Sequence, residues 1–386
     1  MRLSKVFRYP CAILFGLLLA ALTIADLLIP DAEMSEIENR ALKQPPALRA
    51  EALIENRWTA EYGEYVREQF VMRGTWLKMH SLFEQSLQKV ELGGVWLAGE
   101  GYLMSKTAAD AASLQPLVQT NARAVCALGE RYPGRVYAML VPSASNVLED
   151  LLRCDPPRFD ENAAIDAVYG MFKESGINVI DLRESFREAA GSGLQVYYRT
   201  DHHWTTDVGA QLAYIAYCEA AGLAASPPPE HLKQVVGGFL GTDYAKALNA
   251  FVRADELVYY DYPYTISIER RAPDGTAFMQ EDSLMAYEKL ESIDKYGAFL
   301  HGINGYTHIE GGGGSGAIAI IKDSYGNCFA PFLAANYASV EAIDLRGRQK
   351  IDDILDTGCD ILVLYSFSLF SQDTDLFWLR GAGFEP

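Results

Sequence analysis

The larger part of the chain alternates between helical stretches and short, uninterrupted apolar segments, and this alternation begins near residue 108. Apolar strands between helices are typical of a parallel sheet whose two faces are both covered. Strands are expected at residues 136–141, 178–182, 194–199, 316–322, 340–344 and 360–365, and helices at 108–131, 161–175, 206–223, 326–336 and 348–357. The sequence therefore predicts an α/β fold with a mainly parallel sheet flanked by helices. A site is expected beyond the carboxyl ends of its strands.

Two regions depart from this alternation. Residues 31–107 are predicted to form a helical arm and a β-hairpin, because apolar residues first recur at helical spacing and a Gly-rich turn follows. Residues 224–315 interrupt the alternation between a run of three prolines and a run of four glycines. We interpret 224–315 as a lid-like subdomain inserted into a main domain of residues 108–386.

The N-terminus combines three positively charged side chains with an apolar segment from Tyr9 to Pro30, which is about one bilayer's worth of helix. A cleaved signal peptide, a retained signal anchor and a buried core helix all fit this pattern. We favour the anchor, because no convincing small-x-small cleavage site follows the apolar segment. Residues 1–30 are thus predicted to be a cytoplasmic tip and a transmembrane anchor in the cell membrane. The positive flank stays in the cytoplasm in this interpretation, so the rest of the chain is extracytoplasmic.

The net charge of −18 argues against nucleic acid or anionic lipid as a ligand, because phosphate groups would be repelled. The six cysteines suggest neither a disulfide framework nor a zinc site. One of them lies in the apolar N-terminal segment, and the others are widely spaced. Free, buried thiols are their expected state, and no cofactor is expected.

The segment from Tyr198 to Thr205 gathers polar groups that are hard to explain by packing. It contains Asp201, His202 and His203, and it is expected to lie on a turn between a strand and a helix. An aspartate that accepts a hydrogen bond from an imidazole nitrogen prepares the ring to act as a general base for a hydroxyl nucleophile. The residues alone do not distinguish the two histidines in this role.

A candidate for that hydroxyl is Ser324, which follows the strand expected at 316–322 and precedes a helix. Backbone N–H groups at such a helix N-terminus can face a developing oxyanion. The alternative interpretation of Ser324 is an ordinary helix N-cap. Asp201, His203 and Ser324 all follow predicted strand ends, which is the placement that the nucleophile hypothesis requires.

The chain resembles the DHHW protein family, a branch of the SGNH-hydrolase-like proteins. It is also similar to the alginate O-acetyltransferases, which carry an Asp-x-His-Trp motif upstream of a serine nucleophile. The order of several segments carries the resemblance: Glu38–Arg40, Gly94–Trp96, Gly101–Leu103, Asp201–Thr205, Phe239–Thr242, Lys295–Tyr296, Phe299–Leu300, Lys322–Asn327 and Ile343–Arg346. The resemblance implies an SGNH-hydrolase-like fold. It selects Ser324 as the nucleophile, His203 as the general base and Asp201 as the orienting acid.

The resemblance also implies an enzyme that carries out O-acyl transfer or ester hydrolysis on a cell-envelope or secreted polysaccharide. A membrane-bound O-acyltransferase that delivers acetyl groups across the bilayer is the implied partner. A second class of function is a non-catalytic envelope protein that binds glycans or serves as a scaffold on a degenerate SGNH-like fold. Hydrolysis of an acetyl ester by the wild type and by Ser324 and His203 variants distinguishes the two classes.

Six further residues are candidates for substrate contacts or for oxyanion stabilisation: Asn327, Asn304, His202, Tyr325, Trp204 and Arg346. The N–H of Ser324 is the default oxyanion donor, and the side chains of the two asparagines are alternatives. Each of the other four has a structural interpretation as well. These are a purely structural role for His202, core packing for Tyr325, a hydrophobic anchor for Trp204 and a surface salt bridge for Arg346.

A metal site is the remaining interpretation of Asp201, His202 and His203, because carboxylate and imidazole groups bind zinc and iron. Adjacent residues on an extended chain point to opposite sides, so the two histidines are not expected to share one ion. The four other histidines are scattered and supply no evident third ligand. We therefore expect no metal.

Overall fold

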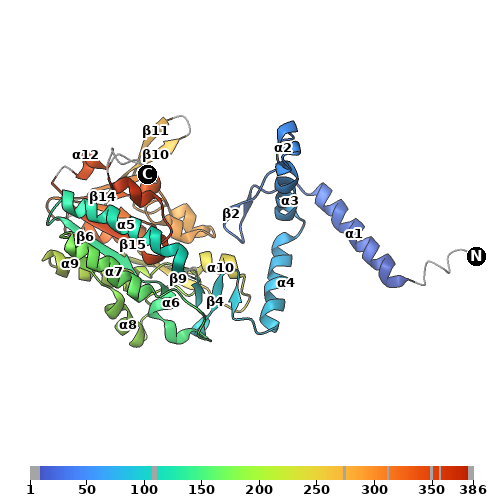
Figure 1. Ribbon diagram of the computed structural model, residues 1–386, viewed down its shortest axis with the longest axis horizontal. Helices are drawn as coiled ribbons and strands as arrows, with labels where there is room; N and C mark the ends of the chain where they lie inside the picture. Colours follow the sequence, from blue (N-terminus) through green and yellow to red (C-terminus); the bar gives the residue numbers. More distant parts are fainter. Residues whose placement is uncertain are drawn as a thin grey trace, which may run out of the picture. The chain divides into compact units, whose positions relative to one another are not determined.

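The structure, a computed structural model, describes residues 9–106, 111–272, 275–310, 313–347, 351–355 and 358–380 (Figure 1). The chain forms two compact units, Met1–Lys89 with Leu248–Ala250 and Val90–Ala247 with Phe251–Pro386. The predicted hairpin therefore belongs to the larger unit. Its strands β3 (Glu91–Leu92), β4 (Val95–Leu97) and β5 (Leu103–Ser105) share a buried apolar cluster with Ala247.

The smaller unit begins with helix α1 (Pro10–Leu28), of which no residue is buried. By length and composition, α1 can cross a membrane, with a mean hydropathy of 2.4 over its apolar window. The predicted helical arm follows as α2 (Ala50–Ile54), α3 (Arg57–Gln69) and α4 (Arg73–Ser86), after a short ribbon of β1 (Met34–Ser35) and β2 (Arg40–Ala41). An apolar helix at the predicted place is thus confirmed, and its retention as an anchor stays a prediction.

An eight-stranded sheet forms the centre of the larger unit, in the order β11-β10-β12-β14-β13-β15-β6-β7. Five neighbouring strands are parallel, as predicted: β14 (Ser339–Ile343), β13 (Ala317–Lys322), β15 (Asp360–Ser366), β6 (Val136–Val141) and β7 (Asn178–Ile180). Antiparallel strands extend one edge: β12 (Tyr306–Glu310), β10 (Thr265–Ala272) and β11 (Gly275–Glu281). Strand β13, which leads to Ser324, therefore lies inside the sheet.

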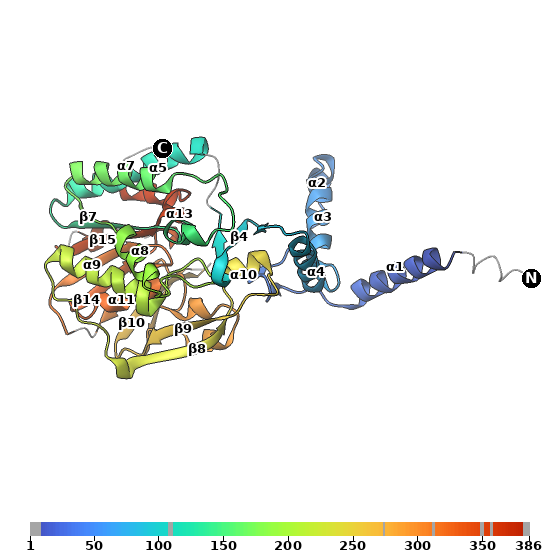
Figure 2. The same ribbon diagram turned by 90° about the horizontal axis from the view of Figure 1, so that it is seen from below.

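Helices cover both faces of this sheet (Figure 2). One face carries α5 (Ala111–Arg131), α7 (Glu161–Glu174) and α13 (Phe367–Phe370), and the other carries α8 (Arg183–Gly191), α9 (Gln211–Ala221) and α11 (Gly326–Leu333). Side chains of β13 alternate between the two cores, with Ile318 and Ile320 in one and Ala319 and Ile321 in the other. The two covered faces explain why the strands read as continuous apolar runs.

The predicted strand at 194–199 is wrong. Only one isolated antiparallel bridge forms there, between Tyr197 and Trp204. The side chains of Val196, Tyr197 and Tyr198 are all buried, as in a strand of a sheet covered on both faces, but the segment pairs with no described strand of the main sheet. Residues 198–203 instead form a closed loop, because the N–H of Tyr198 donates to the carbonyl of His203 at 3.1 Å.

The lid-like subdomain predicted at 224–315 is only partly separate from the main sheet. Strands β8 (Lys233–Phe239) and β9 (Asp255–Tyr260) pair in a ribbon of their own, with α10 (Thr242–Ala247) between them. The later strands β10, β11 and β12 join the main sheet instead. Two further short helices are α6 (Ala144–Val147) and α12 (Asp352–Leu355). Residues 108–110, 348–350 and 356–357 of the predicted helices lie outside the described residues.

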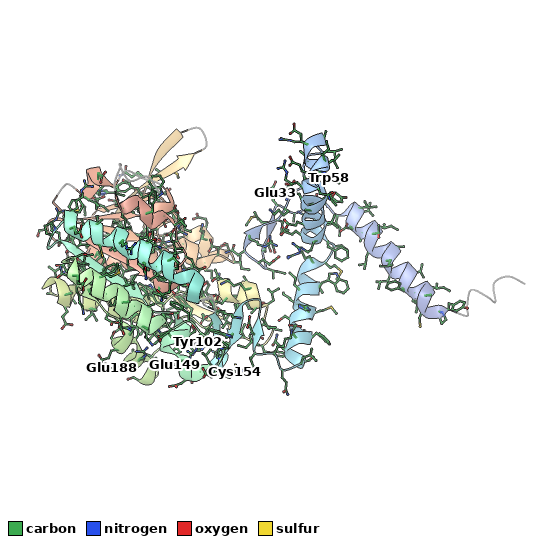
Figure 3. The ribbon with its side chains drawn as sticks, viewed as in Figure 1. Glu33, Trp58, Tyr102, Glu149, Cys154 and Glu188 are labelled. Atoms are coloured by element: carbon green, nitrogen blue, oxygen red, sulfur yellow. The ribbon has the colours of Figure 1, made fainter. Side chains whose placement is uncertain are left out.

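All six cysteines are free thiols. Cys126, Cys218, Cys328 and Cys359 are buried, as expected, whereas Cys11 is exposed. Cys154 is exposed as well (Figure 3).

Candidate active site

Ser324 lies in the tight turn that joins strand β13 to helix α11. The Asp323 carboxylate holds this turn. One oxygen accepts the N–H of Tyr325 at 2.9 Å, and the other accepts the N–H of Ser366, on the neighbouring strand β15, at 2.8 Å. The Ser324 hydroxyl bonds to His203 and forms no cap hydrogen bond to α11 within the described ranges, which does not support the N-cap interpretation. Among the described residues, the N–H of Ser324 has no acceptor, which leaves this donor for a ligand.

The Asp201 carboxylate is buried in the loop at 198–203, and both of its oxygens are occupied. Its Oδ1 atom lies 2.9 Å from the backbone nitrogen of His203 and 2.5 Å from Nδ1 of the same residue. Its Oδ2 atom accepts the backbone N–H of Thr242 at 2.7 Å and the Thr242 hydroxyl at 3.0 Å. These bonds fix the plane of the carboxylate and favour the His203 tautomer with its proton on Nδ1.

The fold brings Ser324 beside His203, although 121 positions separate them in the chain. Nε2 of His203 lies 2.7 Å from Oγ of Ser324. With the ring proton on Nδ1, Nε2 is the nitrogen that can accept the hydroxyl proton. A hydroxyl, an imidazole and a carboxylate in hydrogen-bonding sequence are the geometry of an activated nucleophile.

Tyr296 contacts both His203 and Ser324. Its ring stacks on the imidazole of His203, with ring centroids 3.7 Å apart and planes inclined by 12°. Its hydroxyl donates to the carbonyl oxygen of Ser324 at 3.2 Å. A single buried side chain thus fixes the plane of the imidazole and the backbone of the serine.

Gly241 leaves the space that the Asp201 carboxylate fills. A Cβ atom at position 241 would lie 2.2 Å from Cβ and 2.3 Å from Oδ2 of Asp201, which is far inside van der Waals contact. Our sequence analysis assigned no role to Gly241, Thr242 or Tyr296. The signal that could have found them is the family resemblance, because all three lie in segments that carry it.

Burial sets the charge of the two central groups. It lowers the pKa of His203 to about 4, and the neighbouring charge of His202 acts in the same direction, against the attraction of Asp201. His203 is therefore neutral at pH 7 and can accept a proton. Burial by itself would raise the pKa of Asp201. The attraction of the imidazoles of His203 and His202 and the hydrogen bonds from His203 and Thr242 outweigh it, so this pKa lies below its ordinary value.

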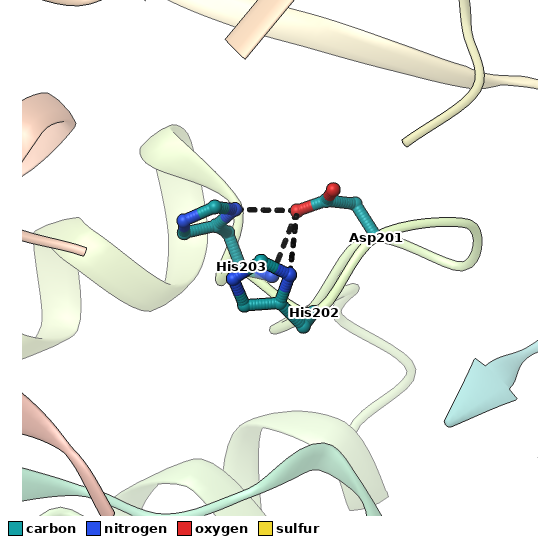
Figure 4. Close-up of side chains that lie close together, drawn as sticks. All are labelled: Asp201, His202 and His203. Atoms are coloured by element: carbon teal, nitrogen blue, oxygen red, sulfur yellow. Dashed lines mark hydrogen bonds and ion pairs between the residues drawn. The ribbon is translucent and has the colours of Figure 1, made fainter. Parts of the chain in front are cut away.

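The prediction that His202 and His203 point to opposite sides is wrong. The chain bends at these residues instead of continuing as a strand, and both rings turn toward Asp201 (Figure 4). Their ring centroids lie 3.9 Å apart. Nδ1 of His202 is 2.6 Å from the hydroxyl oxygen of Thr242 and 3.9 Å from Oδ1 of Asp201. The His202 side chain, 35% exposed, forms the open side of the cluster.

Trp204 is fully buried, so its assignment as a substrate contact is wrong. Its indole N–H donates to the carbonyl of Tyr325 at 3.2 Å, and its ring packs against Phe186 and Phe329. Trp204 is therefore the hydrophobic anchor that the competing interpretation describes. Tyr325 is also buried, and its hydroxyl donates to the carbonyl of His202, so it packs the serine turn against the histidine loop.

Asn304 and Asn327 are buried and hold the loop at 300–302. The side-chain amide of Asn304 donates to the carbonyl of Leu300 at 2.7 Å, and that of Asn327 donates to the carbonyl of Gly302 at 3.3 Å. Each of these bonds uses one of the two N–H groups of its amide and does not test an oxyanion role for the other. Their oxyanion role stays a prediction.

Arg346 forms a two-point ion pair with Asp344, with nitrogen–oxygen distances of 2.8 and 2.6 Å. This pair agrees with the salt-bridge interpretation, except that the carboxylate is buried and not on the surface. The guanidinium is close enough to His203 to contribute to the lowering of its pKa. A substrate contact for Arg346 stays a prediction.

Comparisons with known proteins place this chain in a family. Among solved structures, a DHHW family protein from Eubacterium siraeum DSM 15702 is similar, with 20% identity and a TM-score of 0.57 over 75% of this chain and 96% of that one. Bacillus cereus PatB1, solved with a sulfonyl adduct, is 18% identical with a TM-score of 0.56, over 74% of this chain and 98% of the other. At these identities, the similarity shows the fold.

The O-acetyltransferase domain of Pseudomonas putida AlgJ is 16% identical with a TM-score of 0.46, over 74% of this chain and 98% of that domain. A search of curated proteins found no match. The model of the family described as "DHHW protein" matches residues 91–343, which is well over half of the chain and includes Asp201, His203 and Ser324. The chain therefore belongs to the DHHW protein family.

Proposed function

We propose that this protein is a serine-dependent O-acyltransferase or esterase that acts on a cell-envelope or secreted polysaccharide. The hydrogen-bonded series from Asp201 through His203 to Ser324, with distances of 2.5 and 2.7 Å, carries the proposal. The N–H of Ser324, which has no acceptor in the described part of the chain, supports it, because acyl transfer needs a donor where the oxyanion develops. His202 takes no step in the proposed course.

The first half of the reaction would form an acyl-enzyme. Nε2 of His203 takes the proton of the Ser324 hydroxyl, and Oγ attacks the carbonyl carbon of an acyl donor. The N–H of Ser324 donates to the negative oxygen of the tetrahedral intermediate. When the bond to the leaving oxygen breaks, that oxygen takes the proton from Nε2, and the acyl group stays on Ser324.

The second half would release the acyl group to a hydroxyl. Nε2 of His203 takes a proton from a sugar hydroxyl in transfer, or from water in hydrolysis. The resulting oxygen attacks the acyl carbonyl, and the proton returns from Nε2 to Oγ of Ser324. Asp201 stays ionised throughout and stabilises the imidazolium that forms in each half.

The setting of the reaction rests on helix α1. We propose that α1 stays as a membrane anchor, with the larger unit outside the cytoplasm and a membrane-bound O-acyltransferase as the partner that supplies acetyl groups. An apolar helix after three positive side chains supports this orientation. The mass of the mature N-terminus tests it, because loss of residues 1–30 would identify a cleaved signal peptide instead.

Hydrolysis of p-nitrophenyl acetate tests the chemistry. Ser324→Ala and His203→Ala are each expected to lower kcat/KM by about a thousandfold or more, with circular dichroism unchanged. The exposed Ser192 provides a matched control, and Ser192→Ala should keep the wild-type rate. Equal rates in all four proteins would overturn the proposal and favour the non-catalytic glycan-binding or scaffold class.

A sulfonyl fluoride gives a test that does not depend on the substrate. The structural relative PatB1 was solved with a sulfonyl adduct, and an activated serine hydroxyl attacks sulfonyl fluorides. Oγ of Ser324 would form the bond to sulfur, fluoride would leave, and the hydroxyl proton would pass to solvent by way of His203. Mass spectrometry should find the adduct on Ser324 in the wild type and in no peptide of His203→Ala.

A further inference from the structure

The two histidine rings and the Asp201 carboxylate form a group of donor atoms that the proposed reaction uses only in part. One oxygen of Asp201, Nδ1 of His202 and Nδ1 of His203 converge (Figure 4), and one ligand atom from each side chain lies within 4.8 Å of the other two. Asp201 and His203 belong to the proposed reaction, whereas the His202 ring bonds to the Thr242 hydroxyl and takes no step in it. The cluster therefore has one more imidazole than acyl transfer requires.

We propose that this cluster is an inhibitory binding site for zinc, the borderline metal that prefers imidazole and carboxylate ligands. The ligands would be Nδ1 of His202, Nδ1 of His203 and one oxygen of Asp201, with water as the fourth. The inhibition rests on the proposed function, whereas metal binding does not depend on it.

The present distances lie close to those that zinc needs. Ligands at about 2.0–2.2 Å from zinc in a tetrahedron lie about 3.3–3.5 Å from one another. Nδ1 of His202 is 3.9 Å from Oδ1 of Asp201, so this pair would close by about half an ångström. Nδ1 of His203 is 2.5 Å from the same oxygen, so that pair would open by slightly less than one ångström.

Access and charge also favour a cation at this place. Asp201 and His203 are buried, whereas His202 is partly exposed and gives zinc a side from which to enter. Asp201 supplies a negative charge with no Lys or Arg bonded to it among the described residues. The imidazole of His202 would exchange its bond to the Thr242 hydroxyl for a bond to zinc.

Zinc at this position would stop the reaction by changing the tautomer of His203. In the metal-free site the ring proton is on Nδ1, and Nε2 accepts the proton of Ser324. Zinc on Nδ1 displaces that proton, and the neutral ring keeps it on Nε2 instead. No proton is gained or lost overall, but Nε2 then has no lone pair for the serine hydroxyl. Removing the metal would restore the original tautomer.

The variant that isolates this site is His202→Asn. The asparagine amide can keep the hydrogen bond to Thr242, but it is a poor zinc ligand. His231 is exposed and lies elsewhere in the larger unit, so His231→Asn is the matched control. Each protein is compared with its own metal-free rate of p-nitrophenyl acetate hydrolysis, so a change in basal rate does not affect the comparison.

We expect micromolar zinc chloride to inhibit the wild type and His231→Asn, and EDTA to restore both. His202→Asn should need at least tenfold more zinc for half-inhibition, and magnesium chloride should inhibit none of them. Equal zinc sensitivity of His202→Asn and the wild type would overturn the site.

Calorimetry separates this inference from the proposed function. Ser324→Ala has no nucleophile, yet it should bind one zinc per chain with an affinity within about threefold of the wild type, and His202→Asn should bind at least tenfold more weakly. If no protein hydrolyses the ester but this binding pattern holds, the site stands and the proposed function fails. If the ester is hydrolysed and Ser324→Ala binds no zinc, the site is overturned and the function stands.

Discussion

Two buried aspartates lie beside the candidate catalytic pair: Asp201 contacts His203, and Asp323 precedes Ser324. The two carboxylates differ in their hydrogen-bond partners. Asp201 and Asp323 are both nearly inaccessible to solvent, and each accepts two backbone N–H bonds. Asp201 also faces two imidazoles, whereas the partners of Asp323 among the described residues are the backbone N–H groups of Tyr325 and Ser366 and the Ser366 side chain. The two carboxylates are therefore equally buried but lie in different hydrogen-bonding environments.

The charge of each carboxyl follows from that difference. Burial raises the pKa of Asp323, and its hydrogen bonds offset this only in part. Burial acts in the same direction on Asp201, but the imidazoles and hydrogen bonds reverse the shift and hold its pKa below the ordinary value. We infer that Asp201 fixes the tautomer and orientation of the base, while Asp323 fixes the backbone shape of the serine turn.

The largest expected effect separates the two aspartates most clearly. Asp201→Asn should lower kcat/KM for an acetyl ester by about three orders of magnitude, because an amide cannot hold the His203 proton on Nδ1 as a carboxylate does. The variant should stay folded, since the shape of the side chain is retained. Stopped-assay kinetics with a thermal melt as the folding control check this. A rate within tenfold of the wild type would show that Asp201 does not orient the base.

The next prediction moves Asp201 without removing its charge. Gly241→Ala would place a methyl group 2.2 Å from Cβ of Asp201, so the carboxylate must shift. A displacement of about 1 Å in a catalytic group can cost about a hundredfold in rate. The exposed Gly191, at the end of α8, has open space around it, so Gly191→Ala serves as the matched control. Similar rates in the two variants would mean that the position of Asp201 tolerates change.

The pH dependence gives a smaller effect and tests the base itself. Because the pKa of His203 is lowered to about 4, the neutral ring predominates at all higher pH values. The value of kcat/KM should be flat between about pH 5 and 7 and should fall about tenfold by pH 3, as the ring gains a proton. A midpoint near 6.5, the ordinary value of an exposed histidine, would contradict the buried environment in the structure.

The fold was more predictable from sequence than the site. Residues 316–322, 340–344 and 360–365 formed strands close to their predicted bounds, because continuous apolar runs between helices leave few alternatives. The run at 194–199 was misread as a strand, because its three central side chains, Val196, Tyr197 and Tyr198, are apolar and buried as in a strand of a covered sheet. The backbone N–H groups of Arg199 and Thr200 donate to the Asp255 carboxylate and help to hold the loop that follows.

The site depends on contacts that spacing along the chain does not encode. The motif and the family resemblance predicted the hydrogen-bonded series of Asp201, His203 and Ser324. A role for Tyr296 was not predicted, because nothing in its local pattern indicates that its ring stacks on His203 and that its hydroxyl bonds to the Ser324 carbonyl. The side-by-side orientation of the two histidines was also unpredictable, because it follows from the bend at 201–203.

The smallest expected effect on rate belongs to the second aspartate. In Asp323→Asn, the amide oxygen can accept from Tyr325 or from Ser366, and the amide nitrogen then faces the other N–H as a second donor. A buried N–H without an acceptor costs about 1–3 kcal/mol, so the free energy of unfolding should fall by that amount. The value of kcat/KM should fall less than tenfold, because the hydrogen-bonded series from Asp201 through His203 to Ser324 is intact.

Urea denaturation and ester hydrolysis on the same preparation measure both quantities for Asp323→Asn. Asp201→Asn provides the contrast, because its kcat/KM should fall by about three orders of magnitude while the variant stays folded. If Asp323→Asn lost as much activity as Asp201→Asn while folded, the two carboxyls would share one function. The division between an aspartate that orients the base and one that shapes the serine turn would then have to be abandoned.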